Sequence, residues 1–307
     1  MTAATPVAQL ARPSSTDRWR PRGASDWLFL LIPSSAAIGS AFGSVDVAGV
    51  TLYPFKVLVL VAAGVVVAQH RRTPAAGHPV LILSVGLAGW ALLSMTWSPA
   101  GPRALQEASI FIFVVALMVV AVRSIGTNWF ASLITGWPLA IAVMLVVAAW
   151  ELVTGNHLPS DFVQDAPDYS RGVVLATFGN PNNFGAFLAL AAGICLIAAT
   201  MSSIFDAAVR RLMVIAATLA LVVLPITASR LAVLGMIAGL MTFGVLGLRS
   251  RRGQPFAIAC AALAVPAVVV VWRVSPALVS KFVDIAAQST GRGNSTSIRE
   301  NLILNGW

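Results

Sequence analysis

The sequence predicts an all-α protein, a polytopic transmembrane helical bundle of about nine spans with its N-terminus in the cytoplasm. Its 307 residues are 58% hydrophobic and only 10% charged, and the mean hydropathy is +0.86. This balance excludes an ordinary soluble domain. Apolar runs of roughly 20 residues, each long enough to cross a bilayer core of about 30 Å, recur along the chain. The distribution of basic residues sets the orientation.

Nine apolar runs follow a basic tail. They cover residues 27–44, 48–68, 80–97, 104–122, 129–153, 174–200, 208–226, 230–248 and 255–273. We therefore expect a disordered cytoplasmic tail over 1–26, a transmembrane helical domain over 27–273, and the start of a large extracytoplasmic loop over 274–307. A cleaved signal peptide is the alternative for the first run, because small residues follow it. We favour an uncleaved anchor, since the later loops fit a topology that counts this segment.

Basic residues concentrate in the segments that this topology places in the cytoplasm. The tail and the even-numbered connections hold 12 of the 20 Lys and Arg residues, together with three acidic residues. An excess of Lys and Arg on the cytoplasmic side is what orients helical membrane proteins. The expected location is therefore the cytoplasmic (inner) membrane, crossed several times, and the lipid bilayer is an expected partner.

Several classes of function find no support in the sequence. The net charge of +9 is scattered among apolar segments instead of lying on one soluble face, so we expect no nucleic-acid partner. Cys195 and Cys260 lie within apolar runs without a Cys-x-x-Cys spacing, which indicates neither a disulfide framework nor a zinc site. The sequence contains no Walker loop, nucleotide fingerprint or Ser-His-Asp arrangement. We expect no metal and no cofactor.

The hairpin Pro225–Arg230 joins two long apolar runs with almost no loop between them. The topology places it at the outer face of the membrane, where a charge needs a partner. Arg230 could simply anchor its helix by reaching lipid phosphates, but anchoring arginines favour the cytoplasmic side. A guanidinium fork suits a diphosphate, which it binds with paired, charge-assisted hydrogen bonds. We favour a substrate-binding role for Arg230, with Ser229 beside it.

Three asparagines mark the start of the sixth run: Asn180, Asn182 and Asn183, around Pro181. Asparagine caps helices and proline suits the first helical turn, so one reading is a helix start at the outer interface. Three asparagines exceed what a cap needs, and their amides could bind sugar hydroxyls or a pyrophosphate. The two readings are compatible, and we count all three as candidate substrate-binding residues.

Glu151 lies near the outer end of the fifth run, where an acidic residue usually pairs with a base. We expect Arg171 or Arg230 as its partner, and we count Glu151 and Arg171 among the candidate substrate-binding residues. His157, in the outer loop 154–172, fits a solvated residue better than a base, and nothing in its spacing makes it a metal ligand.

These motifs resemble the O-antigen ligase and polymerase family of bacterial envelope enzymes. The resemblance spans most of the chain and rests on Phe-Gly-Asn-Pro-Asn-Asn at 178–183, the Thr227–Arg230 hairpin, the Glu151–His157 region and the segment Ser297–Trp307. Members of that family are metal-independent membrane glycosyltransferases. The resemblance implies inverting transfer of a glycan from an undecaprenyl diphosphate carrier to an acceptor glycan or glycolipid on the outer face of the membrane.

The resemblance also implies roles for two arginines. Arg230 matches the arginine that follows a serine at the start of the family's conserved region, and it would bind the carrier pyrophosphate. Arg299 is similar to the arginine of the large loop, and it would act catalytically by stabilising the leaving diphosphate. The family's loop histidine, taken as the base, has no counterpart here. We therefore expect the sequence to be a fragment that ends inside the large loop and is inactive alone.

A transporter or flippase of lipid-linked sugars or small solutes is the alternative function. Prolines within the apolar runs, Pro54, Pro138 and Pro266 among them, would suit the broken helices of alternating access. Against this reading, the two halves of the sequence contain no matching pair of interrupted segments. The motifs do not distinguish a ligase from a polymerase.

Overall fold

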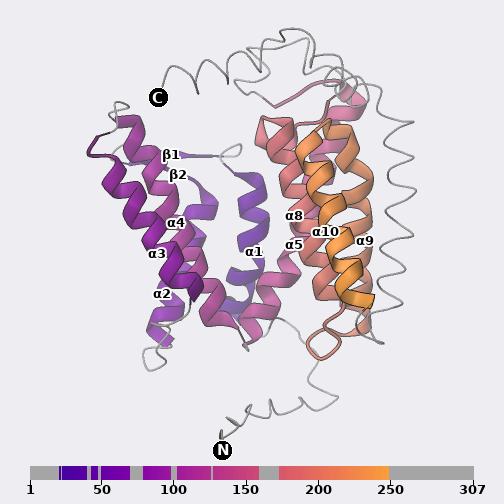
Figure 1. Cartoon of the computed structure of the whole chain (residues 1–307), viewed down its shortest axis with the longest axis horizontal. Coiled ribbons are helices and arrows are strands. Elements are labelled where there is room, and N and C mark those ends of the chain that lie inside the picture. The colour runs from indigo at the N-terminus through magenta and orange to yellow at the C-terminus, as the bar shows by residue number, and fades with distance from the viewer. Residues whose placement is uncertain are drawn as a thin grey trace, which may run out of the picture. The chain divides into compact units, whose positions relative to one another are not determined.

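A computed structural model describes residues 21, 23–39, 43–47, 50–69, 79–97, 102–125, 127–158 and 173–248. These residues are mostly helical, and each of the first eight predicted apolar runs contains one α-helix (Figure 1). The elements in chain order are α1 (Ala24–Ile38), β1 (Val45–Val47), β2 (Val50–Leu52), α2 (Pro54–Gln69), α3 (Pro79–Ser94), α4 (Pro102–Ser124), α5 (Asn128–Thr154), η1 (Ala176–Phe178), α8 (Pro181–Ala199), α9 (Ala207–Val223), η2 (Leu224–Thr227) and α10 (Arg230–Leu248). The expected helical class is confirmed.

Three of the described helices are long and apolar enough to cross a membrane. They are α5, α8 and the continuous helical segment Ala207–Thr227, which joins α9 to η2. Shorter apolar helices of 10–17 residues accompany them in the described part of the chain. The ninth predicted run, 255–273, and the loop 274–307 lie outside the described residues. Nine spans and a cytoplasmic N-terminus stay predictions.

Two boundaries differ from the predicted runs because turn chemistry overrides hydropathy. The first run was expected to extend to residue 44, but α1 ends at Gly39, whose φ of 59° is easily adopted only by glycine. Residues 45–47 and 50–52 then form a short antiparallel ladder, in which Val45 pairs with Leu52 and Val47 with Val50. A proline at the first helical position opens α2. The purely helical prediction thus missed one small β-hairpin.

The chain divides into two compact units. Of the described residues, the first unit holds those up to 158 together with 176–178 and 191–220. The second unit holds 173–175, 179–190 and 221–248.

The core of the first unit lies where α1 packs against α5 and α2, and where α2 packs against α4. Phe29 of α1 stacks on Trp129 of α5, with ring centroids 5.0 Å apart and planes inclined by 13°. Such an offset aromatic pair contributes about 0.5–1.5 kcal/mol beyond its buried area. The other buried members of this cluster are Ile32, Val59, Ala62, Val66, Val120 and Leu133.

The crossing of α1 and α5 is a direct backbone contact at Gly136. A Cβ built on Gly136 would meet the carbonyl oxygen of Leu30, and it would lie 3.0 Å from both the Leu30 carbonyl carbon and Pro33 Cδ. Helices in a bilayer associate through such small residues, because apolar side chains gain little by leaving lipid.

We predict that Gly136→Ala destabilises the protein by about 1–3 kcal/mol, because the added methyl forces α1 and α5 apart. The measurement is the thermal unfolding midpoint of the purified protein in detergent. Gly64→Ala in α2 is the matched control, since a Cβ there meets no atom within 4 Å. Equal midpoints for Gly136→Ala and wild type would contradict the close crossing.

Candidate functional site

The hairpin that carries Arg230 is a continuation of α9. The helix tightens into η2 at Leu224, and Ala228 then reverses the chain with a left-handed backbone, φ 52° and ψ 23°. Thr227 closes the turn with its hydroxyl, which donates to the Leu224 carbonyl at 2.7 Å and accepts from the Ser229 amide at 3.3 Å. α10 begins at the next residue, Arg230. The near absence of a loop, expected from the sequence, is confirmed.

Two hydroxyls of this hairpin are buried. Thr227 is 0% exposed and Ser229 is 1% exposed. Among the described residues, none forms a hydrogen bond with Ser229 Oγ. A buried hydroxyl without a partner costs about 1–3 kcal/mol, which a ligand oxygen would recover. Ser34 shares this property among the described residues, but Ser229 differs in lying directly before Arg230 at the start of α10.

The hairpin lies directly against the first turns of α8, and both belong to the second unit. A Cβ built on Gly185 would lie 2.7 Å from Ser229 Cβ, 2.9 Å from Thr227 Oγ1 and 3.0 Å from Ala232 Cβ. Only a glycine lets the two backbones approach this closely. The structure thus brings together two stretches of sequence that were singled out separately. We call Gly185, Thr227, Ser229 and the start of α10 the hairpin cluster.

The structure shows which asparagine caps the helix. Asn180 is the cap of α8, because its Oδ1 accepts from the Asn182 amide at 2.8 Å and its carbonyl accepts from the Phe184 amide at 3.1 Å. Asn182 and Asn183 are exposed on the first turn of the helix. The capping role is therefore observed for Asn180, and the substrate-binding roles of all three asparagines stay predictions.

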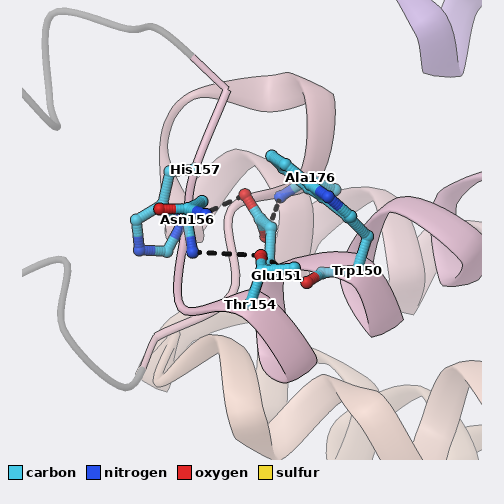
Figure 2. Close-up of polar contacts among 6 residues, drawn as sticks. All are labelled: Trp150, Glu151, Thr154, Asn156, His157 and Ala176. Atoms are coloured by element: carbon cyan, nitrogen blue, oxygen red, sulfur yellow. Dashed lines mark hydrogen bonds and ion pairs between the residues drawn. The ribbon is translucent and has the colours of Figure 1, made fainter.

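Glu151 lies near the end of α5 in the first unit (Figure 2), and its side chain is 1% exposed. Both carboxylate oxygens are engaged: Oε1 lies 3.1 Å from His157 Nδ1, and Oε2 accepts from the Ala176 amide at 2.8 Å. The helix ends next to it at Gly155, whose φ is 68° and whose amide donates to the Glu151 carbonyl at 2.8 Å. One side chain therefore links the two segments that flank residues 158–175.

The expectation of a solvated His157 is wrong. Its side chain is 10% exposed and contacts the buried Glu151 carboxylate. The expected arginine partners of Glu151 are not tested: Arg171 lies outside the described residues, and the side chain of Arg230 is not described. Arg299 also lies outside them. The substrate-binding and catalytic roles assigned to these residues stay predictions.

Two further residues, Gly185 and Ala176, escaped sequence reasoning altogether. A glycine in an apolar run and an alanine after a loop give no signal of a close approach or of a left-handed backbone. The contact of His157 with Glu151 was predictable in principle, since His157 follows Glu151 by six residues and Gly155, a residue that commonly ends helices, lies between them. Among the described residues, no group of three or more His, Cys, Asp or Glu side chains gathers as metal ligands would.

Comparison with known proteins finds one informative similarity. The chain resembles the teichuronic acid biosynthesis protein TuaE of Bacillus subtilis (strain 168), with 22% identity over 228 residues. The match covers 70% of this chain but 46% of TuaE, so the chain spans about half the length of that relative. No family model and no solved structure matches the chain.

We predict that Gly185→Ala disrupts the hairpin cluster, because a methyl cannot fit 2.7 Å from Ser229 Cβ. Overpacking of this kind costs about 1–3 kcal/mol. The measurement is the detergent unfolding midpoint, with Gly193→Ala in the same helix as control, since a Cβ there meets nothing within 4 Å. Identical behaviour of the two variants would refute the close approach of α8 to the hairpin.

Proposed function

We propose that the chain is a membrane glycosyltransferase of cell-envelope polysaccharide assembly, similar to O-antigen ligases and polymerases. It transfers a glycan from an undecaprenyl diphosphate carrier to an acceptor glycan or glycolipid on the outer face of the cytoplasmic membrane. The observation that carries the proposal is the contact of Gly185 with Thr227 and Ser229, which joins the asparagine-bearing turn of α8 to the start of α10. The similarity to TuaE, named for teichuronic acid biosynthesis, supports a role in polysaccharide formation.

The hairpin cluster has the chemistry of an anion site. A helix N-terminus presents unpaired amides and a partial positive charge, and α10 starts at Arg230 itself. The guanidinium adds a full charge with a geometry that matches phosphate oxygens. Ser229 adds a buried hydroxyl, and Asn182 and Asn183 add exposed amides three and two residues before Gly185. We assign the diphosphate to Arg230 and Ser229, and the sugar hydroxyls to the asparagines.

The reaction is a displacement at the anomeric carbon of the carrier-linked sugar. The acceptor hydroxyl forms the new glycosidic bond as the bond to the diphosphate oxygen breaks, and the hydroxyl proton passes to a base. Arg230 and Arg299 neutralise the negative charge that develops on the leaving diphosphate. The phosphate ester supplies the free energy, so the reaction needs no nucleotide at the outer face.

The structure weakens one reason for the transporter alternative. Pro54 is the first residue of α2, so it starts a helix instead of breaking one. Pro138 lies inside α5, which continues through it over 27 residues. Discontinuous helices are the feature that alternating access would require. Pro266 lies outside the described residues.

We predict that Arg230→Ala lowers glycan transfer by about 10²–10³-fold, as does removal of a donor that stabilises developing charge. Arg230→Lys and Arg299→Lys keep the charge but lose the fork, so both should fall between wild type and the Ala variant. The measurement is surface polysaccharide and accumulated lipid-linked glycan after substitution at the native locus. Arg211→Ala, an exposed arginine near the start of α9, is the control. Glycan transfer at the wild-type rate by both Arg230→Ala and Arg299→Lys would contradict the assignment of these arginines to the diphosphate.

We predict that substitution of Asn180 affects stability, whereas substitution of Asn182 or Asn183 affects binding of the donor. Asn180→Ala should lower the unfolding midpoint, because loss of a helix cap costs about 0.5–2 kcal/mol. Asn182→Ala and Asn183→Ala should leave the midpoint near wild type but raise the KM for the lipid-linked donor. Unchanged KM in both would leave the asparagines with the capping role alone.

A further inference from the structure

Glu151 is placed to hold the fold together instead of touching substrate. Its carboxylate is buried, and both of its oxygens already have partners within the protein, at His157 and Ala176. These partners lie on either side of residues 158–175, so a single side chain joins the two ends of that segment (Figure 2). Each oxygen can accept a second hydrogen bond, but the burial of Glu151 leaves little of the carboxylate surface open to a substrate.

The segment that Glu151 holds has a strained backbone. Ala176 has φ 49°, in the left-handed region, where a residue with a Cβ pays roughly 1 kcal/mol or more. Such a conformation persists only where its surroundings fix it. The next residue is fixed too: the Thr177 hydroxyl donates to the Ala37 carbonyl and lies 3.2 Å from Met144 Sδ. Contacts with α5 and α1 therefore keep η1 in place.

We propose that Glu151 is a positioning residue, which clamps His157 and Ala176 and thereby maintains the left-handed turn that leads into the asparagines of α8. Ala176 precedes Asn180 by four residues along the chain, so loosening this turn frees the start of α8 to move. The inference rests on the proposed function, because it assigns to the clamp a role in binding the lipid-linked donor. It replaces the substrate-binding role that the sequence suggested for Glu151.

Two substitutions of Glu151 distinguish a positioning role from a catalytic role of the carboxylate. Glu151→Gln removes the charge but keeps an oxygen for the Ala176 amide and an amide group that can bond to His157 Nδ1 in its other tautomer. Glu151→Leu removes both hydrogen bonds at similar volume. A positioning role predicts that Gln rescues function, whereas a role for the negative charge or the proton predicts that it does not.

The first measurement is hydrogen–deuterium exchange of peptides containing the Ala176 amide, in the purified full-length protein in detergent. Loss of a buried hydrogen bond to a charged group should speed exchange by about tenfold or more in Glu151→Leu, and by only about twofold in Glu151→Gln. Equal exchange in Glu151→Leu and wild type would overturn the clamp. This readout is independent of any enzymatic activity.

The second measurement is steady-state glycan transfer from an undecaprenyl-diphosphate-linked oligosaccharide. Glu151→Leu should raise the KM for this donor by about five- to tenfold with kcat changed less than twofold, since uniform binding is lost. Glu151→Gln should stay near wild type, and Ala176→Gly should partly rescue Glu151→Leu, because glycine adopts the left-handed backbone freely. A fall in kcat in both Glu151 variants, or no rescue by Ala176→Gly, would overturn the positioning role. Absence of transfer by the full-length wild-type protein would refute the proposed function, while the exchange measurement would still decide whether Glu151 holds Ala176.

Discussion

Close contact between backbones is the constraint on which both units depend. Lipid is as apolar as a leucine side chain, so helices in a bilayer gain little from burying apolar surface and rely on tight van der Waals contact. Gly136 lets α5 meet the Leu30 carbonyl and Pro33, and Gly185 lets α8 meet Ser229 and Thr227. In the second case the same contact positions the polar groups, because the crossing partner is the hairpin itself.

Hydropathy was sufficient to predict where helices form but not where they end. Eight runs became helices because a long apolar segment in a membrane protein can satisfy its backbone only within itself. The ends followed residue-specific rules instead: Gly39 and Gly179 adopt positive φ, Pro54 and Pro181 start helices, and Asn180 caps one. These signals were present in the sequence. A scale that scores only polarity gives them no weight.

The candidate site was predictable residue by residue, but not as an arrangement. Arg230 and the asparagines stood out because polar groups at membrane depth need a reason. The contact between the start of α8 and the hairpin depends on Gly185. A glycine gives no sign in the sequence of a contact with residues some 40 positions away. Likewise, the pairing of Glu151 with His157 required the αL turn at Gly155 to bring the chain back over the end of α5. Charge complementarity alone predicts an arginine partner for Glu151 and gives no indication of the histidine.

The caps of α1 have a consequence for the lipid around it. The helix holds 15 residues between Gly23 and Gly39. At a rise of 1.5 Å per residue it is about 22 Å long, roughly 8 Å shorter than the hydrocarbon core of a typical bilayer. Lipid beside a short helix thins, at a cost of fractions of a kcal/mol per Å. If α1 crosses the membrane, as the sequence predicts, hydrophobic mismatch would compress the adjacent leaflets and favour the thinner membranes available to the cell.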